Sequence, residues 1–311
     1  MSKKKLFTPD IIIVSSLSLL TILNGFLMKR RYKCRLIFEI RDIWPLTITE
    51  TGSYRTSNLF IKILAFIERF GYNKSDAVVG TMPNLKEHVQ KIVKAPCKCY
   101  CIPQGVDIEL FSDPEPLPFG YAEKYLPSKR FIVVYMGSIG RTNALETLLE
   151  CAKALQNNRK VHFLLVGNGD MLENFKIETA KMTNITFAPK VKKSQVQTIL
   201  QKCDLTYDSA KNTKLYQYGL SRNKWIDYLF AAKPLVASYS GFKSIINEAN
   251  CGTFVPPENV KELTETILYY SEMDKNTIES IGNRGKRWLI RNRSFKKLAL
   301  DYYKICKELQ N

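Results

Sequence analysis

After residue 130 the chain alternates regularly between short apolar runs and amphipathic stretches. The apolar runs read as strands, and they fall at 131–136, 161–166, 184–187, 204–208 and 234–238. Helix-like stretches begin near residues 143, 171, 193, 222 and 259. Continuous apolar strands separated by helices are typical of a parallel sheet with helices on both faces. The pattern therefore predicts an α/β, doubly wound domain over residues 131–275.

A second domain is predicted before residue 113, because the same pattern recurs there more sparsely. Its strand-like runs lie at 11–14, 36–40, 76–79 and 99–102. Residues 113–130 contain four prolines and little apolar periodicity, which predicts a linker. A chain of 311 residues can bury two separate cores. We therefore expect an N-terminal domain at 1–112, a linker at 113–130 and a C-terminal domain at 131–275.

The apolar run DIIIVSSLSLLTILNGFLM lies between the basic residues Lys3–Lys5 and a second basic cluster that begins at Lys29. A signal peptide would carry a small-residue cleavage site, and none follows the run. A membrane-spanning helix would bury Asp10, Asn24 and several hydroxyl groups in lipid. The β-branched start and the two serines instead favour a strand at 11–14, a turn and a helix to about residue 30.

Composition limits the classes of partner. Lysine and arginine number 47 against 29 acidic residues, which gives a net charge of +18. This excess favours phosphate-bearing substrates or an anionic membrane surface. No nucleic-acid-binding motif accompanies it, so we expect no nucleic acid partner. The eight cysteines are scattered and only two histidines are present, so we predict reduced thiols and no metal site built from these residues.

Residues 215–236, LYQYGLSRNKWIDYLFAAKPLV, read as a polar loop, a short helix and a buried strand. At about 100° per residue, Asn223, Lys224 and Asp227 share one narrow sector of the helix, opposite its apolar residues. With Ser221 as the N-cap, backbone N–H groups and a lysine would converge on an anionic ligand. Asp227, one turn later, could accept hydrogen bonds from sugar hydroxyls. An ordinary capped surface helix is the alternative.

Further candidate site residues follow other predicted strands. Gly137 and Arg141 come after 131–136, and Gly167 comes after 161–166. Glycine lets the backbone approach a ligand, and arginine offers a fork of donors to phosphate. Each loop alone could be a simple tight turn, but together they indicate a ligand site at the carboxyl edge of the sheet. Arg41 and Asp42 follow 36–40, where they either face a ligand or tie a loop.

Several of these stretches, taken in order, resemble the retaining glycosyltransferases of family 4. The matching stretches are RDIWP, IPQGVD, YMGSIGR, LLVGNGD and SRNKWIDYLFAAKP. The resemblance is nearest to bacterial enzymes of O-antigen or capsule assembly. It implies the GT-B fold, in which two Rossmann-like domains with parallel sheets face each other, and C-terminal helices at 276–311 that pack back on the first domain.

The resemblance also implies roles for the candidate residues. Arg141 and Lys224 would hold the diphosphate of the donor, Asp227 would hold the ribose, and Arg41 and Asp42 would face the acceptor. Asp42, Arg141 and Lys224 would be the catalytic residues. The remaining donor-binding positions would be Gly137, Gly167, Ser221 and Asn223.

Two departures from the family pattern matter. The first acidic position of the family's Glu-x7-Glu element falls on Gly219. The family's Gly-rich opening strand, loop and helix are not found either, so we expect the first domain to be reduced or truncated.

The implied reaction is metal-independent transfer of a hexose or N-acetylhexosamine from a nucleotide sugar, most simply a UDP-sugar. The acceptor would be lipid-diphosphate-linked or a saccharide. The protein would then be cytoplasmic and peripheral on the inner face of the cell membrane. Two alternatives stay open, namely an inactive truncated glycosyltransferase that acts as a binding partner and a nucleotide-sugar epimerase of the same fold. SRNK also matches Ser-x-x-Lys of penicillin-binding enzymes, but the partner motifs of those enzymes do not follow it.

Overall fold

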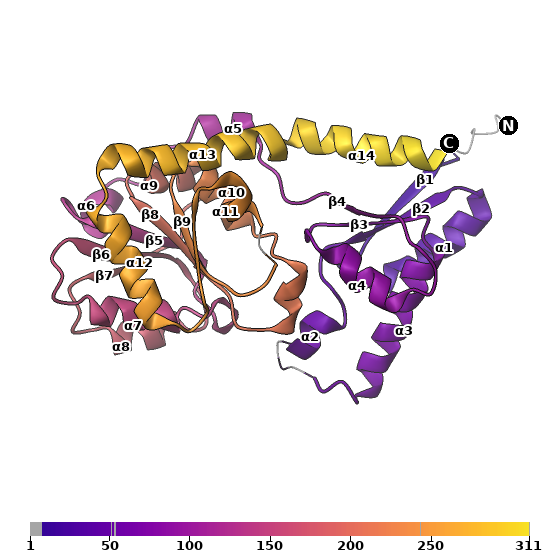
Figure 1. Cartoon of the computed structure of the whole chain (residues 1–311), viewed down its shortest axis with the longest axis horizontal. Helices are drawn as coiled ribbons and strands as arrows, with labels where there is room; N and C mark the ends of the chain where they lie inside the picture. Colours follow the sequence, from indigo (N-terminus) through magenta and orange to yellow (C-terminus); the bar gives the residue numbers. More distant parts are fainter. Residues whose placement is uncertain (1–7, 51, 53, 243, 311) are drawn as a thin grey trace. The chain divides into compact units, whose positions relative to one another are not determined.

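A computed structural model describes residues 8–50, 52, 54–242 and 244–310. The predicted role of Lys3–Lys5 as a basic flank therefore lies outside the described residues. The chain divides into two compact units, each with its own sheet (Figure 1). Unit 1 holds the chain as far as Pro103, together with Thr213–Ser221 and the segment from Lys296 on. Unit 2 holds Gln104–Asn212 and Arg222–Phe295.

Unit 1 is built on a four-stranded parallel sheet of order β1-β2-β3-β4. Its strands are β1 (Ile11–Ser15), β2 (Arg35–Ile40), β3 (Ala77–Gly80) and β4 (Cys99–Cys101). Its helices are α1 (Thr21–Tyr32), α2 (Leu46–Glu50), α3 (Leu59–Lys74), α4 (Leu85–Ile92), the 3-10 turn η3 (Lys214–Tyr218) and α14 (Phe295–Gln310). All four strands predicted before residue 113 are confirmed, and so is the strand, turn and helix interpretation of residues 11–30.

Side chains alternate across the strands of unit 1, and helices cover both faces of the sheet. Leu36, Phe38 and Ile40 of β2 pack with α1, α3 and α4 on one face. Ile37 of β2 points the other way, where Ile305 of α14 packs against the sheet. Figure 1 shows α14 running along the face opposite to α1, α3 and α4. Burial of both faces explains why these strands are almost continuously apolar.

None of the described helices combines the length and apolar character needed to cross a bilayer.

Unit 2 is built on a six-stranded parallel sheet of order β10-β9-β8-β5-β6-β7. Its strands are β5 (Phe131–Ser138), β6 (Val161–Asn168), β7 (Ile185–Ala188), β8 (Leu205–Ser209), β9 (Leu235–Ser238) and β10 (Gly252–Val255). The first five confirm the predicted strands, and β10 was not predicted. The strand order reverses between β5 and β8, and ligands bind near such a point, at the carboxyl ends of the strands.

Helices cover both faces of the second sheet as well. The helices and 3-10 turns of unit 2 are α5 (Ile108–Ser112), α6 (Tyr121–Tyr125), η1 (Arg141–Asn143), α7 (Glu146–Ala154), α8 (Leu172–Glu178), η2 (Lys193–Gln195), α9 (Val196–Gln201), α10 (Asn223–Phe230), α11 (Ile245–Ala249), α12 (Val260–Glu272) and α13 (Lys275–Arg293). One core joins the sheet to α7, α8 and α12. On the other face α10 lies between α9 and α13.

Two predicted boundaries differ from the structure. The expected linker at 113–130 packs within unit 2, because the segment around η2 and α9 satisfies its backbone groups. The Ser194 carbonyl accepts the Glu115 N–H at 3.0 Å, and Thr198 Oγ1 donates to the Glu115 carbonyl at 2.7 Å. The C-terminal segment expected at 276–311 divides near residue 295, so that α13 stays with unit 2 and α14 lies on unit 1.

Candidate functional site

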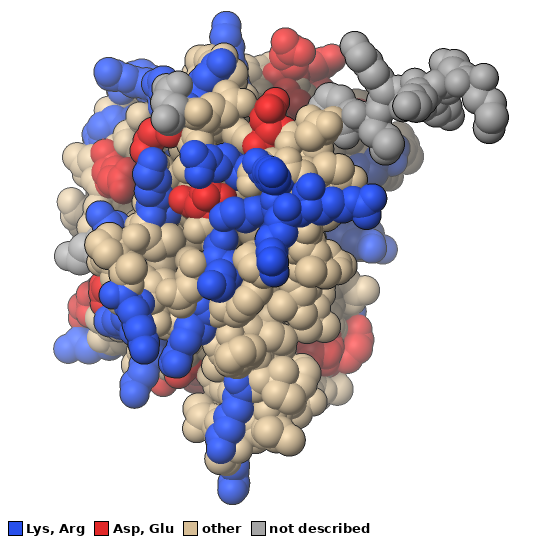
Figure 2. Space-filling view, turned by 90° about the vertical axis from the view of Figure 1, so that its right-hand side faces the viewer, with Lys and Arg blue, Asp and Glu red and all other residues tan. Residues whose placement is uncertain are grey.

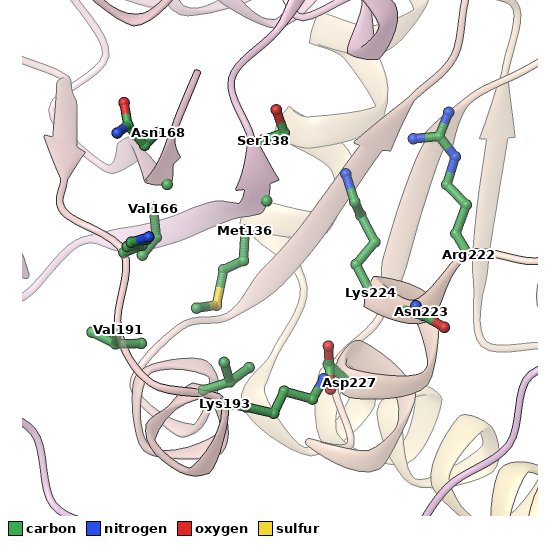
Figure 3. Close-up of a pocket in the computed structure, with 14 residues that line it drawn as sticks. Met136, Ser138, Val166, Asn168, Val191, Lys193, Arg222, Asn223, Lys224 and Asp227 are labelled. Carbon is green, nitrogen blue, oxygen red and sulfur yellow. Dashed lines mark hydrogen bonds and ion pairs between the residues drawn. The ribbon is translucent and has the colours of Figure 1, made fainter.

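A cavity of about 620 Å³ opens at the carboxyl edge of the unit 2 sheet (Figure 3). It is called the cationic cavity below. Its walls are Met136, Gly137 and Ser138 of β5, Val166, Gly167 and Asn168 of β6, Lys190, Val191, Lys193 and Val196 after β7, and Arg222, Asn223, Lys224 and Asp227 at the start of α10. Four of these residues are cationic and one is acidic, so the cavity favours an anionic ligand.

Two buried hydrogen bonds fix α10 against the sheet. Trp225 Nε1 donates to Asp208 Oδ2 on β8 at 2.7 Å, and the Met136 N–H on β5 donates to Tyr228 Oη at 2.8 Å. The apolar side of α10 is therefore held by polar contacts as well as by packing, and its other side is left to line the cavity. This arrangement agrees with the predicted division of the helix into two faces.

Helix α10 begins one residue later than the sequence suggested. Its N-cap is Arg222, whose backbone is extended and whose side chain makes no capping hydrogen bond. The prediction of Ser221 as the N-cap is therefore wrong, and Ser221 is grouped with unit 1. The shift places the Arg222 side chain beside the first turn of the helix, where it lines the cavity.

Asp208 is the buried anion behind the cavity, with a side chain only 1% exposed. Lys224 Nζ lies 3.1 Å and Arg222 Nη1 lies 3.4 Å from its Oδ1. Arg222 Nη1 also donates to Asn143 Oδ1 at 3.1 Å. One carboxylate therefore orients two cations, which fixes their positions before any ligand binds.

The Lys224 side chain is largely buried and lies beside a charged group, Asp208. Burial lowers the pKa of its ammonium group, and the neighbouring Asp208 carboxylate opposes that effect. The ammonium donates to Tyr135 Oη at 2.9 Å and lies 4.1 Å from the centre of the same ring. Gly137 makes room for it, since a Cβ at that position would lie 3.1 Å from Lys224 Nζ. Figure 3 shows Lys224 reaching from α10 toward β5.

Asp227 lines the cavity as predicted, but it already has a partner. Lys193 from η2 forms a short ion pair with its Oδ1 (Figure 3). Burial raises the pKa of the Asp227 carboxyl, and the Lys193 ammonium acts in the opposite direction. A hydroxyl-bearing ligand at Asp227 would therefore meet a lysine as well as a carboxylate.

Arg141 does not line the cationic cavity. Its side chain is 77% exposed, and its Nε lies 3.5 Å from Asp170 Oδ2.

Gly167 does line the cavity, but a glycine is required there because a side chain would not fit between neighbouring strands of the sheet. A Cβ there would lie 1.9 Å from the Gly137 carbonyl oxygen of the neighbouring strand. The close approach is thus between β5 and β6, and the glycine is needed whether or not a ligand binds.

Arg41 and Asp42 follow β2 in unit 1 and are both exposed. Arg41 pairs with Glu39 at 3.6 Å, and its backbone N–H donates to Ser16 Oγ at 2.9 Å. The Asp42 carbonyl accepts from the Trp44 N–H at 3.1 Å. The alternative in which Arg41 and Asp42 tie a loop by pairing with each other is thus not what the structure shows, since Arg41 takes Glu39 instead.

Three of the four cationic residues of the cavity were missed by sequence reasoning, namely Arg222, Lys190 and Lys193. Arg222 stands directly before the predicted helix sector, next to Ser221, the predicted N-cap. Lys190 and Lys193 belong to a basic run after β7. Their position after a strand of the same sheet is the signal that could have found them.

A second cavity of about 400 Å³ adjoins the first and shares Gly167, Asn168 and Lys190 with it. Tyr125, Leu172 and Phe187 supply apolar and aromatic surface there. The two cavities together offer a cationic compartment beside a partly aromatic one. Such a pair suits a ligand with an anionic centre and a planar or apolar end.

Residues 130–272 match the family model described as glycosyl transferases group 1. No curated protein matches significantly. Among solved structures, the sucrose-phosphate synthase from Thermosynechococcus elongatus is similar at 17% identity and a TM-score of 0.75, over 96% of this chain and 73% of that protein. HepE from Anabaena in complex with UDP is similar at 13% identity and a TM-score of 0.71, over 96% and 79%.

A glycosyltransferase from Rickettsia africae is similar at 20% identity and a TM-score of 0.67, over 94% of this chain and 83% of that protein. At these identities the structures show a shared fold. They confirm the α/β prediction of two parallel sheets with a reduced first domain. Residues 130–272 are thus similar to a glycosyl transferases group 1 domain, and the structural relatives show the GT-B fold.

Proposed function

We propose that this chain transfers a sugar, with retention, from a nucleotide diphosphate sugar to a lipid-linked or saccharide acceptor in surface polysaccharide assembly. The observation that carries the proposal is the cationic cavity, where Arg222 and Lys224 are fixed by one buried carboxylate. Two preset cations at a helix N-terminus stabilise a diphosphate as its negative charge grows. The second cavity then suits the nucleoside.

The proposed roles follow from these positions. Lys224 and Arg222 hold the donor diphosphate, and Asp227 holds the ribose after exchanging part of its contact with Lys193. Gly137, Gly167 and Asn223 line the donor site, and Ser221 precedes it. Arg141 was expected at the diphosphate, and that role stays a prediction. Arg41 and Asp42 are proposed for the acceptor side.

The proposed reaction breaks the bond between the anomeric carbon and the diphosphate oxygen, and the electron pair leaves with the nucleoside diphosphate. The acceptor hydroxyl oxygen forms the new bond on the same face of the sugar. Its proton passes to the departing phosphate, and Asp42 is the proposed alternative base. The cations supply the charge stabilisation, so we propose that the reaction needs no metal.

The ligands bound in related structures support the choice of substrates. HepE has been solved with UDP and with UDP-glucose. A TarM variant has been solved with UDP and α-GlcNAc-glycerol. We therefore propose a UDP-hexose or UDP-N-acetylhexosamine donor. A lipid-diphosphate acceptor would place the protein on the cytoplasmic face of the membrane, which the net charge of +18 favours.

One observation favours an inactive binding partner as the second candidate. Gly219 occupies the position where an acidic residue is expected, and its φ is +94°. A Cβ there would lie 2.5 Å from Pro83 Cγ. A glutamate side chain could not stand at this position without backbone strain and a clash, so its contribution to donor binding would have to come from elsewhere.

The test is donor turnover. The purified chain is incubated with UDP-glucose, UDP-galactose and their N-acetylated forms, with and without a lipid-diphosphate acceptor, and released UDP is measured. We expect release with one of these donors in the wild type and at least a tenfold lower rate in Lys224→Met. UDP binding without release from any donor would favour the inactive binding partner.

A further inference from the structure

Helices α1 and α3 of unit 1 present large apolar side chains to solvent. Leu27 of α1 is 62% exposed, and Leu59 and Phe66 of α3 are 72% and 70% exposed. Leu20, Leu23 and Ile63 are also exposed. We propose that these six residues, called the α1–α3 face, dock on an anionic lipid bilayer.

The six residues lie on one sector of each helix. Leu20, Leu23 and Leu27 follow i, i+3, i+7 spacing, and Leu59, Ile63 and Phe66 follow i, i+4, i+7 spacing. Opposite sectors carry the core residues, such as Ile22 in α1 and Leu64 in α3. Each helix is therefore apolar on two sides, although the core needs only one.

The two helices are joined side by side. The rings of Phe26 in α1 and Phe70 in α3 pack edge to face with centroids 5.1 Å apart. Lys29 Nζ donates to the Lys74 carbonyl at 3.0 Å near the ends of the same helices. The exposed sectors of α1 and α3 thus belong to one continuous surface.

The exposed charged side chains of α1 and α3 are all basic. Exposed basic residues on or beside the two helices are Arg30, Arg31, Lys33, Arg55, Lys62 and Arg69. Glu68 is the one acidic residue within α1 and α3, and it is 4% exposed and bonded to Tyr72 and His88. Nearby Asp76 is paired with Lys29 at 2.7 Å and Arg35 at 3.4 Å.

Figure 2 looks toward the side of unit 1 that carries α1 and α3, and it shows many basic side chains, with fewer acidic ones among them, beside an uncharged area. Apolar side chains that enter the interface, with lysine and arginine that contact anionic headgroups, are the features of peripheral membrane binding. A protein partner would instead be expected to call for both signs of charge or for hydrogen-bond donors and acceptors in fixed positions. The charge pattern therefore favours lipid.

This inference rests on the peripheral location in the proposed function, but its test needs no transfer activity. The full chain is sedimented with vesicles of phosphatidylcholine alone and with vesicles that also contain phosphatidylglycerol. We expect at least tenfold tighter partitioning to the anionic vesicles, and weaker partitioning at high salt. Equal partitioning to both vesicle types would overturn the proposal.

Amino-acid substitutions test whether the α1–α3 face is the surface that binds the vesicles. Leu27→Ser with Phe66→Ser should weaken partitioning at least tenfold, and Arg30→Glu with Arg31→Glu should do the same. The matched controls in unit 2 are Ile177→Ser, at a side chain 77% exposed, and Lys181→Glu, and both should partition within twofold of the wild type. If partitioning to vesicles falls as much in the control variants as in the α1–α3 variants, the docking proposal is also overturned.

Two further measurements distinguish failure of the docking proposal from failure of the proposed function. UDP affinity of each variant reports on unit 2, so vesicle binding without UDP binding would leave the docking surface standing and remove the proposed donor site. Light scattering without vesicles reports on self-association. If the wild type forms a dimer, and the combined substitution Leu27→Ser with Phe66→Ser dissociates it, then a second copy covers the α1–α3 face. That result would overturn the lipid assignment.

Discussion

Lys224 Nζ on α10 and Asp208 Oδ1 on β8 lie 3.1 Å apart, and their side chains are 15% and 1% exposed. Arg222 shares the same oxygen, and Trp225 donates to the other one. This buried carboxylate, with three donors around it, holds both cations in place. The cavity thus presents positive charge whose position is set from behind by Asp208.

Replacing Asp208 with asparagine should reduce both stability and ligand affinity. The change keeps the shape of the side chain but leaves Lys224 and Arg222 without their shared counter-ion. Loss of one partner of a buried ion pair costs about 3 kcal/mol. We expect the urea midpoint to fall by a corresponding amount in Asp208→Asn. An unchanged midpoint would mean that the carboxylate does not support these cations.

Gly167→Ala should destabilise unit 2, because its Cβ would meet the Gly137 carbonyl oxygen at 1.9 Å. Overpacking against backbone costs about 1–3 kcal/mol or more. Gly140→Ala is the matched control, since its nearest neighbour is the flexible end of Asp170 at 2.8 Å. Thermal unfolding of the two variants should differ by several degrees. Equal melting temperatures would contradict the packing role of Gly167.

His162 on β6 should make stability depend on pH. Burial, with a smaller contribution from Arg130, lowers its pKa from 6.5 to about 4 in the folded chain. The unfolded chain binds the extra proton between these values, so stability is full above pH 6.5 and is lost as pH falls through about 4. The difference corresponds to about 3 kcal/mol.

The measurement for His162 is urea unfolding at pH 7 and pH 5 in the wild type and in His162→Gln. Glutamine does not titrate in this range and can still reach Thr186, whose Oγ1 lies 2.9 Å from His162 Nε2. The wild type should lose more stability than the variant on acidification. The same loss in both proteins would assign the effect to other groups.

Arg222 should matter more than Arg141 for UDP binding. Arg222 lines the cationic cavity with a side chain 16% exposed, and Arg141 is 77% exposed on Asp170. Loss of a charge-assisted hydrogen bond costs about 1.5–3 kcal/mol. We expect Arg222→Met to weaken UDP binding by roughly that amount and Arg141→Met to change it little. A larger loss in Arg141→Met would restore the role implied by the family resemblance.

The fold could be predicted because buried parallel strands leave a strong local pattern. Nine of the ten strands in the described residues were predicted, and most of them are nearly continuous apolar runs. The exception is β10 (Gly252–Val255), which is short and begins with a glycine. Glycine is depleted in strands and typical of turns, so the sequence around Gly252 did not indicate a strand.

Tertiary contacts explain what sequence reasoning missed. Composition marked 113–130 as a linker, but its backbone hydrogen-bonds to residues about 80 positions later, such as Ser194 and Thr198. The predicted sector of α10 did supply Lys224 and Asp227 to one cavity. The pairing of Asp227 with Lys193 joins positions 34 residues apart, and no local pattern encodes it.

The most direct test of the account is calorimetry of UDP binding to the wild type, Lys224→Met and the control Lys275→Met. Lys275 is also in unit 2, but its side chain is 88% exposed. We predict that Lys275→Met binds UDP like the wild type and that Lys224→Met loses about 1.5–3 kcal/mol, roughly tenfold or more in affinity. Equal UDP affinity in all three proteins would contradict a diphosphate site in the cationic cavity.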